Sequence, residues 1–310
     1  MSVYTSQNNI TETVVGKLPA VTIDGLTNFR ISQIFDCGQC FRFDPVTNPK
    51  HETEIEGVAL GKYIRLGQDS PERVTLYNIT ADEYKRIWKH YLALDVDYSA
   101  MRRDIAECFK VASGGMDTVM PKAMECGDGI RLLRQDPWEA VCSFIVSQNN
   151  NIPRIKKIIA AMSKAYGEPI EADGKVYYSF PNAKSLADAG ETAIFELRTG
   201  FRAKYIYDAA CKAANGEIDY DAIKAASPDE AQRLLCEIKG VGPKVAACAM
   251  LFGFDKTEAF PIDVWIKRVL AKYYPSGLDI SALGPYAGLA QQYLFYYERY
   301  MEGNRSGYNN

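Results

Sequence analysis

The stretch that decides the fold, residues 227–268, reads SPDEAQRLLCEIKGVGPKVAACAMLFGFDKTEAFPIDVWIKR. It predicts two short helices joined by a glycine-rich turn at residues 240–242. Ser227 is the expected N-cap of the first helix, with Pro228 at its first position and Glu230 completing a capping box. Apolar residues then recur at helical spacing and give this helix a face to bury.

The turn between these helices has the features of an anion-binding site. Gly240 and Gly242 permit a positive φ and a close approach of the backbone, and Val241 lies between them. The free N–H groups of the turn and the N-terminus of the second helix favour a phosphate group. Lys244 follows in the first helical turn, where the helix dipole disfavours its charged form. The same residues in isolation could equally be an ordinary connection with a surface lysine.

A carboxylate interrupts the apolar run that follows the second helix. Asp263 is flanked by Ile262 and Val264, and such a group is costly to bury unless it caps a helix or takes part in chemistry. The whole string resembles the helix-hairpin-helix and Gly-Pro-Asp signature of the DNA base-excision glycosylases, in the variant that carries a catalytic lysine. The resemblance implies that Lys244 and Asp263 are catalytic. It also implies that the turn at residues 240–242 binds a DNA phosphate.

The composition is that of a soluble chain long enough for two or three packed domains: 310 residues, of which 47% are hydrophobic and 24% charged. We find no membrane-spanning run and no signal pattern, and expect no membrane partner. The eight cysteines lack the paired spacing of a disulfide framework. We therefore expect a cytoplasmic, nucleoid-associated location in a bacterium or archaeon, or a nuclear one in a eukaryote. With a net charge of −3, DNA binding requires a locally basic face.

The pattern along the chain predicts an α+β fold. Short β-rich runs at residues 59–60, 63–66 and 74–77 predict an N-terminal antiparallel β-sheet domain, and a helix is expected at residues 81–90. From residue 98 helical patterns dominate, and residues 167–180 are the clearest irregular stretch. We assign the sheet domain to residues 1–110 and a mostly α-helical, two-part body to residues 111–310, with the helix-hairpin-helix at residues 228–254.

The segment Cys37-Gly38-Gln39-Cys40 first suggests metal or redox chemistry. Zinc needs about four ligands, but no second cysteine pair is present and the only histidines are His51 and His90. A redox motif would precede a helix, whereas residues 41–43 read as a strand. The segment instead resembles the Gly-Gln-x-Phe-Arg turn of the 8-oxoguanine DNA glycosylase family. That resemblance implies that the carbonyl of Gly38 accepts the N7 hydrogen that distinguishes 8-oxoguanine from guanine.

Two further segments resemble the elements by which this family holds the opposite base. Residues 147–154, SQNNNIPR, could simply be a helix cap and loop, but they match the family pattern N-N-N-I-x-R. The match implies that Asn149 and Arg154 contact the unpaired cytosine. Residues 200–205, GFRAKY, imply that Phe201 wedges into the duplex and that Arg202 joins Arg154 on the cytosine.

The base pocket is implied by residues 284–295, GPYAGLAQQYLF, although an apolar stripe of this kind is more often core. The resemblance implies that Gln291 contacts the Watson–Crick edge of the flipped purine and that Phe295 stacks on one face of it. Cys248 would stack on the other face, or be a small buried residue. The sequence departs from the family at three positions: Phe201 replaces a frequent tyrosine, Trp265 a phosphate-contacting histidine, and Glu298 an aspartate.

Together these matches imply a bifunctional DNA glycosylase/AP lyase that excises 8-oxoguanine, preferentially opposite cytosine, from duplex DNA. Flipping the nucleotide costs a few kcal/mol, after which Lys244 would attack the sugar, form a Schiff base and permit β-elimination. We expect a monomer with no required cofactor and no side-chain metal site, and leave open a cation bound by backbone carbonyls of the hairpin.

Three alternatives remain open. A glycosylase for another base, such as thymine glycol or mismatched adenine, often carries a cysteine-bound iron–sulfur cluster after the hairpin, but no cysteine follows Cys248. An alkylpurine glycosylase would usually lack the hairpin lysine. A noncatalytic helix-hairpin-helix protein that binds duplex DNA would not need Asp263.

Overall fold

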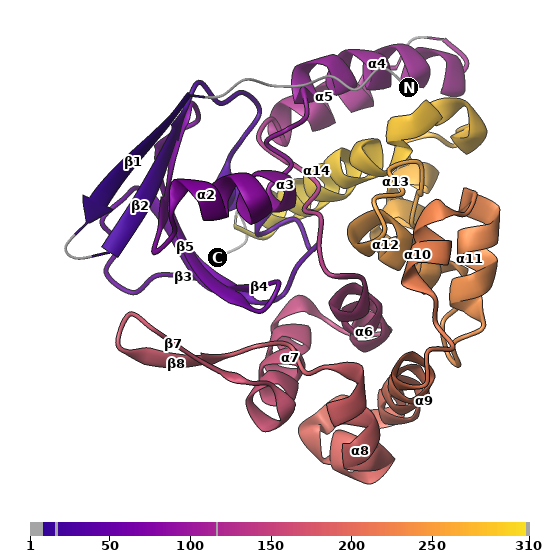
Figure 1. The fold of residues 1–310 in the computed structure, drawn as a ribbon. Helices are drawn as coiled ribbons and strands as arrows, with labels where there is room; N and C mark the ends of the chain where they lie inside the picture. The colour runs from indigo at the N-terminus through magenta and orange to yellow at the C-terminus, as the bar shows by residue number, and fades with distance from the viewer. Residues whose placement is uncertain (1–8, 16–17, 116, 308–310) are drawn as a thin grey trace.

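The computed structural model describes residues 9–15, 18–115 and 117–307. Its N-terminal part is a six-stranded sheet in the order β1-β2-β6-β5-β4-β3, with every pair antiparallel (Figure 1). The strands are β1 (Asn9–Val15), β2 (Leu18–Asp24), β3 (Phe43–Pro45), β4 (Thr53–Ala59), β5 (Lys62–Ser70) and β6 (Arg73–Tyr77). The predicted antiparallel sheet is therefore confirmed.

One helical segment covers the sheet and closes its core. It comprises α2 (Ala81–Glu83), η1 (Tyr84–Trp88) and α3 (Lys89–Tyr91), and so confirms the helix expected at residues 81–90. Tyr84, Trp88 and Tyr91 are buried in one cluster with Val74 and Leu76 of β6. The period-2 alternation of β6 and the helical period of the segment thus bury the same apolar core.

The rest of the chain is mostly helical and shares one large core. In Figure 1, α4, α5, α13 and α14 lie toward one end of this body and α6 to α9 toward the other, with α10 to α12 completing it. The helices after the sheet are α4 (Tyr98–Ala112), α5 (Val119–Cys126), α6 (Pro137–Ser147), α7 (Ile152–Tyr166), α8 (Ala183–Ile194), η2 (Phe195–Thr199), η3 (Gly200–Arg202), α9 (Ala203–Ala214), α10 (Tyr220–Ala225), α11 (Pro228–Cys236), α12 (Pro243–Gly253), α13 (Val264–Tyr273), η4 (Ile280–Tyr286) and α14 (Ala287–Gly307); the short α1 (Ile31–Ile34) precedes β3. The α+β prediction holds, and the boundary at residues 110–111 stays a prediction.

The stretch at residues 167–180 is not irregular, and that expectation was wrong. It forms a β-hairpin of β7 (Pro169–Ala172) and β8 (Lys175–Tyr178). Asp173 and Gly174 make the turn with φ of 49° and 71°, the positive values of a two-residue hairpin loop. The Asp173 carboxylate accepts hydrogen bonds from the Tyr63 hydroxyl (2.9 Å) and the Asn78 amide (3.0 Å), which attaches the hairpin tip to the sheet domain.

The helix-hairpin-helix consists of α11 and α12, and two details of it differ from the sequence prediction. Ser227 caps α11 by accepting the Glu230 N–H, but the Glu230 carboxylate binds Arg233 at 2.7 Å instead of completing a capping box. Gly240 has a φ of +79°, and a β-carbon there would lie 2.3 Å from Cγ of Tyr205. Gly242 has a φ of −99°, so only the first glycine needs the left-handed conformation.

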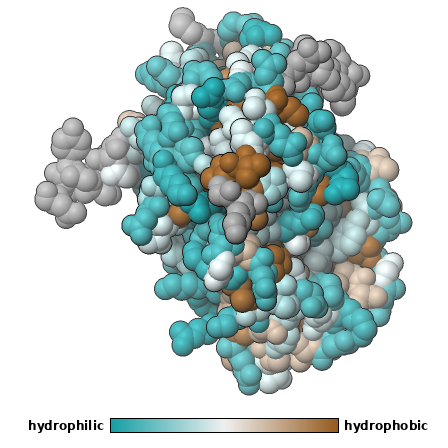
Figure 2. All heavy atoms as spheres, turned by 60° about the vertical axis from the view of Figure 1, so that its left-hand side comes forward, coloured by the Kyte–Doolittle hydropathy of each residue, from teal (hydrophilic) through white to brown (hydrophobic). Residues whose placement is uncertain are grey.

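The face of the molecule in Figure 2 is largely hydrophilic, with its hydrophobic residues in small separate groups. Within the described ranges, no helix has both the length and the apolar character that crossing a membrane requires.

Candidate active site

A cavity of about 800 Å³ brings most of the predicted pocket residues together. This volume is in the range of small-ligand sites. Five segments that are distant in sequence form its wall: the turn after α1, the end of α6 with the loop before α7, the start of α12, the segment that leads into α13, and α14. The predicted residues in the wall are Gly38, Asn149, Gly242, Lys244, Cys248, Asp263, Gln291 and Phe295.

Lys244 and Asp263 reach this cavity from the starts of two different helices. Lys244 is half-buried in the first turn of α12, with Nζ 5.9 Å from the centre of the Phe144 ring. Asp263 is the N-cap of α13, and its Oδ1 accepts the Ile266 N–H at 2.8 Å. The cap fixes the carboxylate while leaving it on the cavity wall. An amine and a carboxylate that line the same cavity can, respectively, attack an electrophilic carbon and stabilise the positive charge that develops there.

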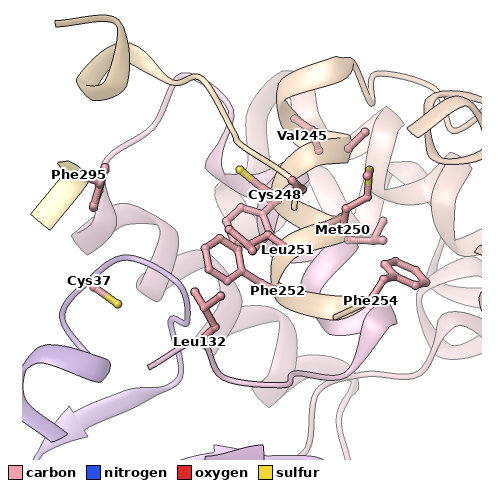
Figure 3. Close-up of a cluster of buried hydrophobic side chains, with 14 of the residues drawn as sticks. Cys37, Leu132, Val245, Cys248, Met250, Leu251, Phe252, Phe254 and Phe295 are labelled. Atoms are coloured by element: carbon pink, nitrogen blue, oxygen red, sulfur yellow. The ribbon is translucent and has the colours of Figure 1, made fainter. Parts of the chain in front are cut away.

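Cys248 lies one turn after Lys244 and is buried. Burial raises the pKa of its thiol, although the neighbouring Lys244 acts in the opposite direction. The protonated thiol presents an apolar, polarisable surface to the cavity. Figure 3 shows Cys248 on α12 and Phe295 on α14, so two groups suited to contacting the faces of a flat ring come from separate helices.

Gly38 and Phe295 form another part of the wall. Gly38 has a φ of +76°, and a β-carbon on it would lie 3.3 Å from Cε1 of Phe295. Phe295 is further enclosed by Trp265, whose ring centre lies 6.3 Å away, and by the Arg299 guanidinium at 5.5 Å. Gly38, predicted to recognise the base through its carbonyl, therefore packs against Phe295, predicted to stack on the base.

Gln39 holds the Gly38 turn in place, a role that the sequence reading did not assign. Its side-chain amide donates to the carbonyls of Ile34 (2.9 Å) and Arg131 (2.8 Å) and accepts the Leu133 N–H at 2.8 Å. Gln39 is 1% exposed. The family pattern pointed to this glutamine, but only the tertiary structure shows what it binds.

The cysteines on either side of this turn are not joined in a disulfide. Cys37 and Cys40 are both buried free thiols, and burial raises the pKa of Cys37 to about 12. Across the described part of the chain, no three His, Cys, Asp or Glu side chains are grouped so that they could hold a metal ion. The Cys37-Gly38-Gln39-Cys40 segment is a packed turn, and its thiols are held in the unreactive protonated form.

Trp265 and Glu298, two departures from the family pattern, have different surroundings. Trp265 lines the cavity, and the Arg268 guanidinium lies 5.0 Å from its ring centre. The Glu298 carboxylate accepts from Lys272 (2.9 Å) and from the Tyr273 hydroxyl (2.9 Å), joining α14 to α13. The Glu298 carboxylate thus has hydrogen-bond partners on the neighbouring helix. Lys267, Arg299 and Gln292 also line the cavity, and the sequence reading assigned them no role.

The residues expected at the opposite base gather beside the cavity. Arg202 is 2% exposed, and its guanidinium donates to the backbone carbonyls of Gln148, Thr199 and Asn149. Phe201 is 49% exposed and packs under that guanidinium at 4.4 Å. Arg154 is exposed and reaches the Arg198 carbonyl at 3.4 Å. In the structure, the hydrogen bonds of Arg202 hold the neighbouring loop in place. Contact of Arg202 with a cytosine remains a prediction.

Comparison with known proteins agrees with this geometry. Residues 23–141 match the model of the 8-oxoguanine DNA glycosylase N-terminal domain, and residues 142–280 match that of the HhH-GPD superfamily base excision DNA repair proteins. The chain is 37% identical over 158 residues to an N-glycosylase/DNA lyase of Saccharomyces cerevisiae and 33% identical over 187 residues to the N-glycosylase/DNA lyase OGG1 of Arabidopsis thaliana. These alignments cover 47% and 54% of the chain, which spans 42% and 51% of the length of the two relatives.

Solved structures match over more of the chain. The 8-oxoguanine glycosylase/lyase of Clostridium acetobutylicum in its apo form is 36% identical, with a TM-score of 0.83 over 96% of this chain and 100% of that one. The same protein in complex with double-stranded DNA containing cytosine opposite 8-oxoguanine is 37% identical, with a TM-score of 0.84 over 95% and 98%.

Fold, hairpin and cavity define the class, the HhH-GPD superfamily of base excision DNA repair proteins. Within that class, the chain belongs to the 8-oxoguanine DNA glycosylase family.

Proposed function

We propose that this protein is a bifunctional DNA glycosylase and AP lyase that excises 8-oxoguanine from duplex DNA, preferentially opposite cytosine. The observation that carries the proposal is the shared cavity. An amine at a helix N-terminus and a capping carboxylate line it together with Gly38, Cys248, Gln291 and Phe295. Membership of the family supports the same reaction.

The reaction begins when the damaged nucleotide leaves the base stack and enters the cavity. The neutral Lys244 amine attacks the anomeric carbon as the glycosidic bond breaks, and the electron pair of that bond leaves with the base, which gains a proton. Asp263 stabilises positive charge on the sugar during this step. Opening of the sugar ring gives a Schiff base, and β-elimination then breaks the bond from carbon 3′ to its phosphate oxygen.

The rest of the duplex is held outside the cavity, which receives only the flipped nucleotide. The N–H groups at the N-terminus of α12 and the turn at residues 240–242 supply a seat for a backbone phosphate. The exposed Phe201 suits insertion into the stack. The Arg202 guanidinium that packs on Phe201 also binds the Asn149 carbonyl, and the exposed Arg154 contacts the Arg198 carbonyl, so Asn149 and Arg154 are candidates for contact with the unpaired cytosine. We propose that the protein acts as a monomer without a required cofactor, with any cation at the hairpin held only by backbone carbonyls.

A borohydride trapping experiment tests the reaction directly. Borohydride reduces the Schiff base, so the protein should become covalently attached to a duplex containing 8-oxoguanine opposite cytosine. Lys244→Gln should abolish the attachment while retaining DNA binding. Lys239→Gln, which removes an exposed lysine on the other side of the same turn, should leave trapping unchanged. Undiminished trapping by Lys244→Gln would disprove the assignment of the nucleophile.

The alternatives give different results in a single-turnover assay. A noncatalytic hairpin protein would release no base and would bind damaged and undamaged duplexes equally. A glycosylase for another lesion would act faster on thymine glycol or on an alkylated purine than on 8-oxoguanine.

A further inference from the structure

Arg299 of α14 joins two distant parts of the chain at the cavity. Its Nη1 donates a hydrogen bond of 2.6 Å to the backbone carbonyl of Asp36, which lies 263 positions earlier in the sequence. The Arg299 side chain is 25% exposed and lines the cavity. A hydrogen bond from a charged donor is about twice as strong as one between neutral groups. Arg299 therefore attaches α14 to the turn that leads into Gly38.

The same guanidinium lies against the ring of Phe295. Phe295 precedes Arg299 by four residues, so the two side chains share one face of α14. Cζ of Arg299 lies 5.5 Å from the centre of the ring, which is within the range of a cation–π contact. The ring in turn packs on Gly38. Figure 3 shows Phe295 on α14 beside the turn that carries Cys37. Arg299 thus contacts both the ring and the turn on which the ring packs.

The turn at residues 36–40 is held from two sides. On one side, the Gln39 amide binds the carbonyl of Arg131 and the N–H of Leu133. On the other side, α14 contributes the bond from Arg299. Without the Arg299 bond, the turn would still be attached to residues 131–133, but this link to the helix that carries the ring would be lost.

The charge of Asp36 adds little to the link. Its carboxylate is 67% exposed and lies 3.8 Å from Nη2 of Arg299, which is too far for a hydrogen bond. Exposed ion pairs of this kind contribute little to stability. The link is therefore made by the backbone carbonyl, which remains in place when the Asp36 side chain is changed.

We propose that Arg299 is a positioning residue for recognition of the flipped base, an inference that rests on the proposed function. It acts through the Gly38 turn and the Phe295 ring, which it holds in one fixed geometry. A displacement of about 1 Å in such a site is enough to slow a reaction strongly. The attack by Lys244 on a sugar that has already lost its base does not depend on this geometry. Loss of Arg299 should therefore affect removal of the base and spare cleavage of an abasic site.

The test compares excision of 8-oxoguanine opposite cytosine with cleavage of a preformed abasic site in the same duplex, both under single-turnover conditions. Arg299→Gln should slow excision by about ten-fold, the effect of one hydrogen bond from a charged donor, and should change abasic-site cleavage by less than about two-fold. Asp36→Asn is the matched control. It keeps the backbone carbonyl and should excise 8-oxoguanine at the rate of the unaltered protein.

Two further measurements show whether Arg299 acts through the turn. Gly38→Ala should itself displace the Phe295 ring. Adding Arg299→Gln to that variant should therefore slow excision by clearly less than it does in the unaltered protein. Binding to a duplex with a tetrahydrofuran abasic analogue, which presents no base, should be the same for Arg299→Gln and the unaltered protein. Weaker binding by Arg299→Gln would indicate a direct contact with the DNA backbone and would overturn the proposal.

The proposal is also overturned if Arg299→Gln excises 8-oxoguanine at the wild-type rate, if Asp36→Asn shows the same loss, or if the two substitutions in the double variant have additive effects. An equal loss of both reactions in Arg299→Gln, including a loss by unfolding, would show a purely structural role and would overturn it too. Failure of the proposed function looks different, because the unaltered protein would then excise no 8-oxoguanine, and both proposals would fall.

Discussion

Phe295 packs on the α-carbon of Gly38, so close that a β-carbon at position 38 would lie 3.3 Å from the phenylalanine ring. The two residues come from opposite ends of the chain and define one edge of the cavity. On the proposed function, Gly38 would present its backbone carbonyl to the base, and the same residue is the surface against which the proposed stacking ring of Phe295 packs. A larger side chain at residue 38 would therefore displace the Phe295 ring and change the space available to a base in the cavity.

Gly38→Ala should lower excision of 8-oxoguanine by about ten-fold or more, because the new methyl group must occupy a φ of +76° and displace Phe295. Cleavage of a preformed abasic site requires no base in the pocket and should fall much less. Single-turnover rates on the two substrates measure the difference. Gly277→Ala, at another positive-φ glycine with open space around it, is the matched control for backbone strain. Equal losses on both substrates would contradict the coupling.

The two arginines beside the cavity should behave differently. Arg202→Lys loses the buried fork that binds three carbonyls and should lower the free energy of unfolding by about 2 kcal/mol. Arg154→Gln changes an exposed side chain and should leave the melting temperature unaltered while reducing the preference for cytosine over adenine opposite the lesion. Thermal melting and excision rates opposite each base check both statements. An Arg202→Lys variant as stable as the unaltered protein would contradict the first.

Glu139 should give the protein a stability that falls as pH rises. Burial raises the pKa of Glu139 to about 7, although the Arg42 guanidinium, 3.3 Å away, opposes the shift. Between the ordinary glutamate pKa near 4.5 and about pH 7, the folded state keeps a proton that the unfolded chain releases. The free energy of unfolding therefore declines across this window, by on the order of 2 to 3 kcal/mol.

Glu139→Gln should remove most of this dependence, because glutamine does not titrate. Urea unfolding at pH 5 and pH 8 measures it, and the decline from pH 5 to pH 8 should be smaller in the variant than in the unaltered protein. Identical declines in the two proteins would show that another group is responsible.

Asp173 should contribute to stability although it lies at the tip of a surface hairpin. Its carboxylate binds the Tyr63 hydroxyl, the Asn78 amide and, at 3.4 Å, the Arg65 guanidinium. Asp173→Asn preserves the turn but loses the charge, and should lower the free energy of unfolding by about 1 to 2 kcal/mol. Asp188→Asn breaks an ion pair exposed on α8 and should change stability little. Urea unfolding of both variants checks the contrast.

The sequence was sufficient where the signal is local. Capping residues, the positive-φ glycine at 240 and the helical spacing after Ser227 are all short-range, and the helix-hairpin-helix formed where it was predicted. The hairpin at residues 167–180 also has a local signal, the Asp173-Gly174 pair between β-rich runs, although the proline and glycine residues of this stretch favour an irregular segment.

Other features depend on partners far away in the chain. In β4, Glu54 occupies a polar position of the alternation, yet it is buried, and Arg65 of β5 pairs with it at 2.6 Å. Gln39 and Gln292 look like ordinary polar residues until the fold encloses them. A buried polar residue is recognised only through its partners, and two of the backbone partners of Gln39, Arg131 and Leu133, lie 92 and 94 residues away in the chain.

The guanidinium of Arg202 has one more consequence, for how DNA is met. By binding the carbonyls of Gln148 and Asn149 in the free protein, it holds in place the loop that we propose to face the opposite strand. The conformational entropy of that loop is lost during folding and does not have to be lost again on association. On the proposed function, this loop would meet the opposite strand already ordered, and the protein would examine a base pair without first ordering its own surface.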